Sequence, residues 1–220
     1  MIKALWRNIQ KDILIEFRSG IIVSIVLSFS VIVTISIGFA TGGIINSPLL
    51  HAVILWIIIF FSGMNTLSHV FFREIEESTA LFGVIHYPAV VIYLSKLLIN
   101  CCVMVVIAIM VIIIYAFVIS VSVYHGIYLI AILIAGSLSL AFATTVIGAI
   151  AALAGARGGL FTILAFPVVL PLFTVAIQST ARCFEQQVFS PLSAIIFLLA
   201  FSMVLGMVSY LLFPYIWREF

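Results

Sequence analysis

Six long apolar runs constrain the fold of this chain more than any other feature of its sequence. They cover about residues 21–40, 49–71, 97–119, 127–154, 160–179 and 192–214. A helix of about 20 apolar residues spans the hydrocarbon core of a bilayer, which is about 30 Å thick. Helices satisfy their own backbone hydrogen bonds in lipid, whereas open sheets cannot. The sequence therefore predicts an all-α polytopic membrane protein, with six transmembrane helices in one domain over residues 1–220.

The composition leaves little room for a soluble domain. The chain is 66% hydrophobic and 7% charged, with a mean hydropathy of +1.45, whereas soluble domains carry about 25% charged residues. Charged side chains interrupt the first 20 residues, so we expect no cleavable signal peptide. Cys101, Cys102 and Cys183 have the spacing of neither a disulfide framework nor a metal site, so no bound metal is expected.

Residues 1–19 have the pattern of an amphipathic helix. Apolar residues recur there at helical spacing, at Ile2, Leu5, Trp6, Ile9, Ile13 and Phe17. The basic residues lie largely off this stripe. A helix of this kind lies in the membrane interface, with basic side chains toward anionic lipid. The alternative is a solvated helix packed on the protein's own loops.

The basic residues predict the orientation in the membrane. Six spans place both termini on one side, together with the loop at 72–96 and the turn at 155–159. All nine Lys and Arg residues except Arg182 then fall on that side. Because basic residues mark the cytoplasmic side of membrane proteins, we expect both termini and the 72–96 loop to be cytoplasmic.

The predicted spans contain no Asp, Glu, Lys or Arg in their interiors. Ion-coupled carriers usually carry such groups near the midplane, and a membrane enzyme needs a base or nucleophile with partners. The chain also lacks a phosphate-binding GxxxxGK[ST] loop, so it cannot hydrolyse ATP itself. Any work it does in the membrane must therefore draw on an energy source in another protein.

The loop at 72–96 has the chemistry to bind such a partner. We predict that its docking residues are Glu74, Glu76, Glu77, Ser78 and Thr79. Acidic residues favour the start of a helix, and hydroxyl residues can cap it. Apolar residues follow, so a short amphipathic helix here could seat in a groove on a partner. The alternative is a plain connecting loop whose charges are solvated.

The fourth and fifth runs carry two further features. Thr144, Gly148 and Ala152 repeat every four residues, a pattern that lets helices approach closely. They could pack within the chain or against a second copy. Pro167 and Pro171 interrupt the fifth run, and each removes a backbone donor. A helix kinked there could act as a gate, although static bundles also contain kinks.

Two histidines are candidates for contact with a ligand. His51 and His125 are predicted near the outer surface, and neutral imidazole is a common haem or metal ligand. Lone interfacial histidines usually ligate nothing. A haem-proximal role for His51 and His125 is therefore a hypothesis, and the alternative is that both are interfacial histidines without a ligand.

Four segments occur in an order that resembles a known family. They are KDILIEFRS at 11–19, REIEESTALFGVIHYPAVVIYLSK at 73–96, GARG at 155–158 and LAFPVVLPLF at 164–173. With six spans, this order resembles the B subunit (CcmB) of the cytochrome c maturation haem exporter. The chain departs from the family's usual pattern at Ser78 and Tyr87. Both positions lie in the predicted docking loop.

The resemblance implies an ABC-2-like permease subunit of the bacterial inner membrane, or of the mitochondrial inner membrane if organellar. Its implied partners are a cytoplasmic CcmA-like ATPase, a CcmC-like haem-handling membrane protein and a small CcmD-like subunit, with two copies of the permease per complex. ATP hydrolysis would serve haem export or release of a haem-loaded periplasmic chaperone. Haem would be handled or transported rather than bound firmly as a cofactor. The alternatives are a permease for a drug, lipid or glycan, and a static membrane scaffold.

Overall fold

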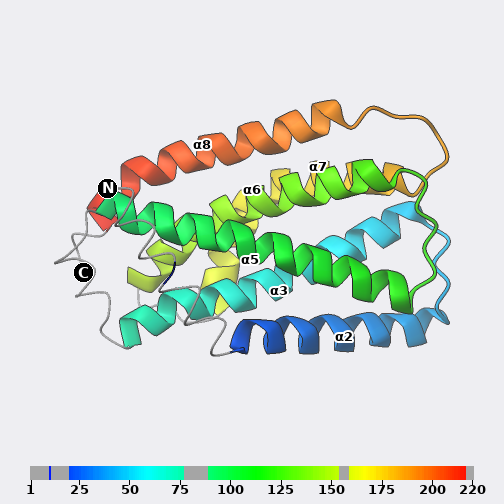
Figure 1. Cartoon of the computed structure of the whole chain (residues 1–220), viewed down its shortest axis with the longest axis horizontal. Helices are drawn as coiled ribbons and strands as arrows, with labels where there is room; N and C mark the ends of the chain where they lie inside the picture. The colour runs from blue at the N-terminus through cyan, green and yellow to red at the C-terminus, as the bar shows by residue number, and fades with distance from the viewer. Residues whose placement is uncertain (1–9, 11–19, 77–88, 154–158, 217–220) are drawn as a thin grey trace.

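The computed structural model describes residues 10, 20–76, 89–153 and 159–216, and these residues form six helices and no strand. The helices are α2 (Ile21–Thr41), α3 (Pro48–Glu76), α5 (Ala89–Val118), α6 (Gly126–Leu153), α7 (Gly159–Cys183) and α8 (Leu192–Ile216). They run along the long axis of the molecule (Figure 1). Each predicted span thus corresponds to one helix. The predicted N-terminal amphipathic helix, apart from Gln10, lies outside the described residues.

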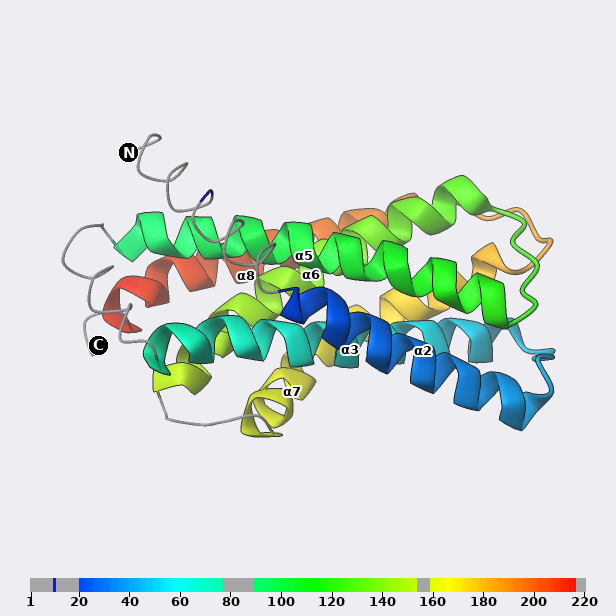
Figure 2. The same cartoon turned by 60° about the horizontal axis from the view of Figure 1, so that its bottom comes forward.

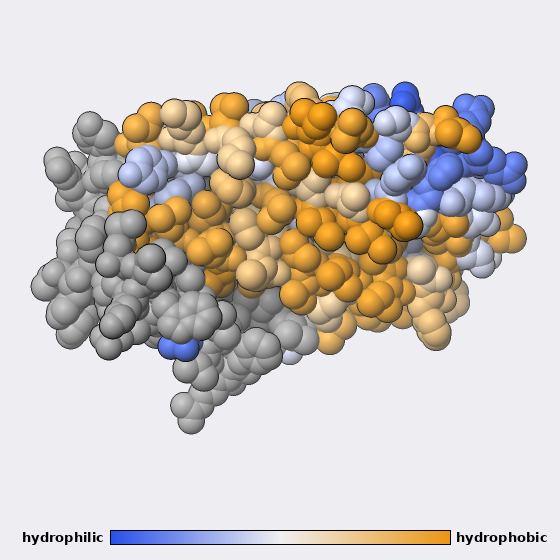
Figure 3. Space-filling view, turned by 45° about the horizontal axis from the view of Figure 1, so that its top comes forward, coloured by the Kyte–Doolittle hydropathy of each residue, from blue (hydrophilic) through white to orange (hydrophobic). Residues whose placement is uncertain are grey.

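The surface of the bundle is that of a membrane protein. Four segments are long and apolar enough to cross a bilayer: Val90–Val118, Gly126–Thr145, Phe166–Cys183 and Leu192–Leu211. Within the described residues, α2 and α3 contribute shorter apolar helices, Val26–Thr41 and Pro48–Met64. Figure 3 shows a broad apolar surface, with hydrophilic residues gathered at the end where the α2–α3, α5–α6 and α7–α8 connections lie.

Two helix ends differ from the sequence prediction. The loop expected at 72–96 is shorter, because α3 continues to Glu76 and α5 begins at Ala89. Helix α3 continues past its apolar run because Arg and Glu are good helix formers, whereas α5 begins early because its apolar segment itself starts at Val90. As a consequence, Lys96 is a residue of α5 rather than of a loop.

The core lies where α6 meets its neighbours. Helix α6 packs against α3, α5, α7 and α8. Its small residues are buried in these contacts, including Gly136, Ser139 and Thr144. Ser139 Oγ also donates to the carbonyl of Leu198 on α8, at 2.6 Å. Of the predicted repeat, Thr144 and Gly148 are therefore buried within a single chain, which was one of the two possibilities left open by the sequence, whereas the side chain of Ala152 lies outside the described part.

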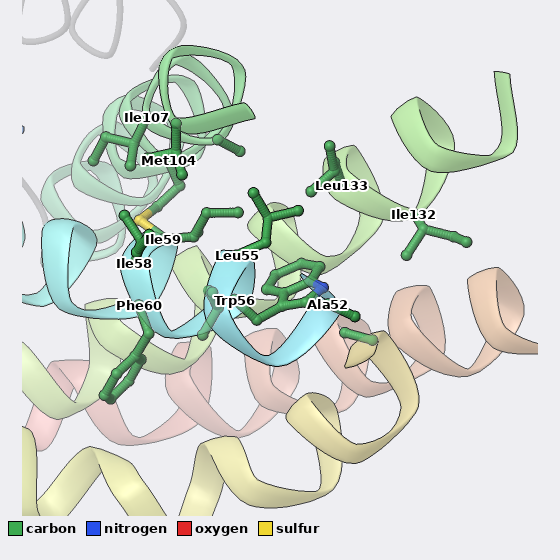
Figure 4. Packing of buried hydrophobic residues seen from close by; sticks show 14 of the residues in the cluster. Ala52, Leu55, Trp56, Ile58, Ile59, Phe60, Met104, Ile107, Ile132 and Leu133 are labelled. Atoms are coloured by element: carbon green, nitrogen blue, oxygen red, sulfur yellow. The ribbon is translucent and has the colours of Figure 1, made fainter. Parts of the chain in front are cut away.

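Among the described residues, Trp56 is the largest fully buried side chain, and it joins three helices. It extends from α3, and Figure 4 shows it among Ala52, Leu55 and other apolar residues of the core. Its indole Nε1 donates to Thr180 Oγ1 on α7, at 2.9 Å. Its ring also fills the space beside Gly136, where an added Cβ would lie 2.2 Å from Trp56 Cη2. The approach of α6 to α3 therefore depends on a residue without a side chain.

Candidate functional site

The two predicted docking residues that the structure describes, Glu74 and Glu76, lie at one end of the bundle. The last residues of α3, α6 and α8 and the first residues of α5 are at this end, opposite the hydrophilic end (Figures 1 and 2). Glu74 and Glu76 belong to the last turns of α3, whereas Glu77, Ser78 and Thr79 lie outside the described residues. The next described helix, α5, begins at Ala89.

The acidic residues are not where the sequence placed them. Glu74 and Glu76 were expected to open a short helix, but they stand at the C-terminal end of α3. Acidic groups are favourable at helix N-termini and unfavourable at C-termini. The helix dipole therefore does not explain why residues 74 and 76 are acidic. Two explanations remain: the carboxylates of Glu74 and Glu76 are solvated, or they bind a partner protein.

A polar stripe on α5 was missed by the sequence analysis. Tyr93, Lys96 and Asn100 are buried on one helix, and each is separated from the next by three or four residues. Residues at this spacing share a helix face. The expectation that the spans contain no ionisable groups was therefore wrong for Lys96, because it lies inside the apolar segment Val90–Val118. The spacing of these three polar residues could have revealed the stripe.

Asn100 connects the stripe to α6. Its Nδ2 donates to Thr145 Oγ1 at 2.9 Å, and Thr145 Oγ1 donates in turn to the carbonyl of Ala141 at 2.6 Å. Tyr93 points toward α8, where its ring packs on Phe213 with centroids 5.2 Å apart. The stripe therefore faces the contact of α5 with α6 and α8.

At the opposite end, His51 occupies a buried site between α3 and α5. Its Nε2 lies 2.9 Å from the carbonyl of Ile45, so Nε2 must carry the proton and donate it. Its Nδ1 then accepts from the Tyr115 hydroxyl, at 2.8 Å. The ring also makes an edge contact with Phe184. Both ring nitrogens are thus engaged, and ligation of haem by His51 would require one of these bonds to break.

His125 lies at the same end but in different surroundings. Its ring stacks on Tyr128 and makes an edge contact with Phe189. Its Nε2 is 3.2 Å from the carbonyl of Gln187, and its backbone N–H donates to the carbonyl of Cys183. Both histidines therefore contact the α7–α8 connection, His51 at Phe184 and His125 at Gln187 and Phe189. The described residues contain no group of three or more potential metal-ligating side chains.

The two predicted kink residues lie inside α7 and are exposed. Pro167 and Pro171 are both within the helix, and both are on its exposed face. The hydroxyl of Thr174 donates to the carbonyl of Pro171 at 2.9 Å. The prolines therefore face the surroundings of the bundle rather than a neighbouring helix.

Replacing Tyr115 by phenylalanine is expected to lower the free energy of unfolding by about 1–3 kcal/mol, because it leaves the buried Nδ1 of His51 without a donor. The measurement is thermal or denaturant unfolding of the purified protein in detergent. Tyr124→Phe is the matched control, since Tyr124 is exposed and only accepts from Gln186. Equal stability of the two variants would contradict the assigned hydrogen bond.

Comparison with known proteins agrees with the structure. No curated protein matches the chain significantly. A family model described as "CcmB protein" matches residues 3–215, which is nearly the whole sequence. The match includes the six described helices up to the last residue but one of α8, the polar stripe of α5 and the segment between α3 and α5. The chain therefore belongs to the CcmB family, the non-catalytic permease subunits of the haem-export ABC transporter of cytochrome c maturation, which work with a separate ATPase subunit.

Proposed function

We propose that ATP hydrolysis by the partner subunit is coupled to movement of this subunit through the segment that joins α3 to α5. The observation that carries the proposal is the placement of this segment: it follows the acidic end of α3 and leads into α5, a helix packed against four others. The contacts of α5 with α2, α3, α6 and α8 mean that a displacement of its first turns is passed to most of the bundle. A partner that grips the segment thus acts on the whole domain.

The docking residues in this proposal are Glu74, Glu76, Glu77, Ser78 and Thr79. Electrostatic complementarity sets the orientation and the association rate of such contacts, so the partner's groove should be basic. We further propose that all six helices span the membrane in an ABC-2-like arrangement, with both termini and the docking segment cytoplasmic. Residues 1–19 would then lie in the interface of the same leaflet.

In this scheme, the work done on the bundle serves haem export or the release of a haem-loaded periplasmic chaperone. The complex would contain two permease copies, CcmC-like and CcmD-like membrane proteins, and no firmly held cofactor in this subunit. Of the two histidines, His125 is the better candidate for a haem-proximal role, since both nitrogens of His51 already have partners. Pro167 and Pro171 would let α7 bend during the cycle.

Charge reversal tests the docking surface. The double variant Glu76→Lys, Glu77→Lys is expected to reduce co-purification of the ATPase subunit by about tenfold, equivalent to about 1.4 kcal/mol of binding free energy. The measurement is the ratio of the two subunits after affinity purification from detergent-solubilised membranes. Covalent haem on c-type cytochromes should fall in parallel.

Glu185→Lys is the matched control for the charge reversal. Glu185 follows the end of α7 at the opposite end of the bundle, so its reversal should leave the ATPase bound. Undiminished co-purification of the Glu76→Lys, Glu77→Lys variant would reject the docking role.

A further inference from the structure

The polar stripe of α5 is buried within an apolar segment. Tyr93 is 1% exposed, Lys96 4% and Asn100 0%. Lys96 is seven residues beyond Ala89, which places its Cα about 10 Å along the helix from that end. Ionisable groups are costly inside a membrane and mark functional sites by default. The stripe is also separate from the proposed docking residues, which precede α5.

Two atoms of the stripe lack hydrogen-bond partners. Within the part of the chain that the structure describes, neither Tyr93 Oη nor Asn100 Oδ1 is hydrogen-bonded. The nearest polar side chain to the Tyr93 hydroxyl is Ser209 on α8, whose hydroxyl donates to the carbonyl of Leu205 at 2.6 Å and keeps lone pairs that can accept a hydrogen bond. Buried polar atoms without partners cost free energy, so each one in a native structure requires an explanation.

The chemistry of the three side chains points to an anion. Lys96 carries the charge of the stripe and already has an interaction of its own, which a ligand would join. A cation would be repelled by Lys96. An apolar molecule would leave Tyr93 Oη and Asn100 Oδ1 without a hydrogen-bond partner. An oxyanion next to Tyr93 and Lys96 would accept from the phenol and from the ammonium group. Asn100 Oδ1 could then accept another ammonium N–H and orient the Lys96 side chain.

We propose that Tyr93, Lys96 and Asn100 form a membrane-embedded binding site for a carboxylate or phosphate group of an amphipathic molecule. Helix α8 packs mainly on α6 and less on α5. Movement of α8 away from α5 would therefore open the stripe toward lipid, because Tyr93 contacts α8 through Phe213. The head group would bind at the stripe while the apolar part of the ligand remains among the helices.

Two molecules could supply this head group. Haem carries two propionate carboxylates, and this source rests on the haem-export role discussed above. An anionic phospholipid carries a phosphate, and this source does not depend on that role. Neither requires the docking segment to bind the ATPase, so failure of this site and failure of the docking proposal are distinguishable.

The test uses the full-length chain co-purified with its ATPase subunit and placed in phosphatidylcholine nanodiscs. Haem and haem dimethyl ester, in which both propionates are esterified, are titrated by absorbance. If haem is the ligand, the wild type should bind haem about tenfold more tightly than the diester, and Lys96→Met should remove this difference. If a lipid is the ligand, native mass spectrometry should show retained phosphatidylglycerol that Lys96→Met loses.

Conservative variants separate binding from folding. Tyr93→Phe removes one hydroxyl and should weaken the same ligand about threefold, which keeps the test decisive if Lys96→Met does not fold. Lys96→Arg should retain binding because it keeps the charge. Ser95→Ala is the matched control, since Ser95 is equally buried on α5 but donates to the carbonyl of Ile92, off the stripe. The proposal is overturned if Lys96→Met and Tyr93→Phe change neither haem nor phosphatidylglycerol binding.

Discussion

Replacing Gly136 by valine is expected to lower the free energy of unfolding by about 3 kcal/mol, at the upper end of the usual cost of overpacking a core. The added Cβ would lie 2.2 Å from Trp56 Cη2 and 2.9 Å from Cζ2. The indole has nowhere to move, because it is fully buried and its N–H is bonded to Thr180. Helices α3 and α6 would therefore have to separate along the centre of the bundle.

Gly126→Ala is the control for this prediction. Gly126 is the first residue of the same helix, and an added Cβ would meet no atom within 4 Å. Unfolding of the purified variants in detergent, followed by intrinsic fluorescence, gives the comparison. The double variant Gly136→Ala, Trp56→Phe has a smaller ring opposite the added methyl group, so it should recover part of the stability lost in Gly136→Ala. The effects of substitutions on stability are not additive when the two residues are in contact. A Gly136→Val protein as stable as Gly126→Ala would refute the packing described for Trp56.

Loss of this subunit is expected to abolish covalent attachment of haem to c-type cytochromes. The physical reason is that, in the proposed scheme, the ATPase subunit acts on the membrane through this permease, so its ATP hydrolysis does no work there when the permease is missing. The measurement is haem staining of membrane proteins in a deletion strain, together with the haem content of the periplasmic chaperone. Loaded chaperone should accumulate if the transporter serves release, whereas unloaded chaperone should accumulate if it serves haem export.

Complementation distinguishes this function from the alternatives. Wild-type protein and the Glu185→Lys variant should restore the cytochromes, whereas the Glu76→Lys, Glu77→Lys variant should not. Normal cytochrome c content in the deletion strain would contradict the haem-export role. ATPase activity that is unchanged by reconstitution with the permease would instead favour a static scaffold.

The positions of the six helices could be predicted because they depend on a local property. An apolar run of about 20 residues has one stable arrangement in a bilayer, whatever its neighbours are. The predicted ends of α2, α6 and α8 agree with the structure to within a few residues. The prediction was least accurate between α3 and α5, because α3 continues past its apolar run to Glu76 and the apolar segment of α5 begins earlier than predicted, at Val90.

The candidate sites also divide into features that depend on local sequence, which could be predicted, and features that depend on distant residues, which could not. The acidic segment after residue 72 stands out in the sequence because it is charged in an otherwise apolar chain. The engagement of both His51 nitrogens could not be predicted, since it depends on Tyr115, which is 64 residues away. Lys96 was assigned to a loop because a lysine next to an apolar run usually marks the membrane surface.

The sequence by itself determined that this chain is a helical membrane protein of the CcmB family, because bilayer thickness and family motifs are both read along the chain. The tertiary structure alone decided that the described small residues of α6 pack within one chain, that Gly136 accommodates Trp56, and that the buried Tyr93 and Asn100 contact α8 and α6. Hydropathy determines how deep a residue lies in the membrane. Which residues meet across helices is determined by packing, and packing depends on side chains that are distant in the sequence.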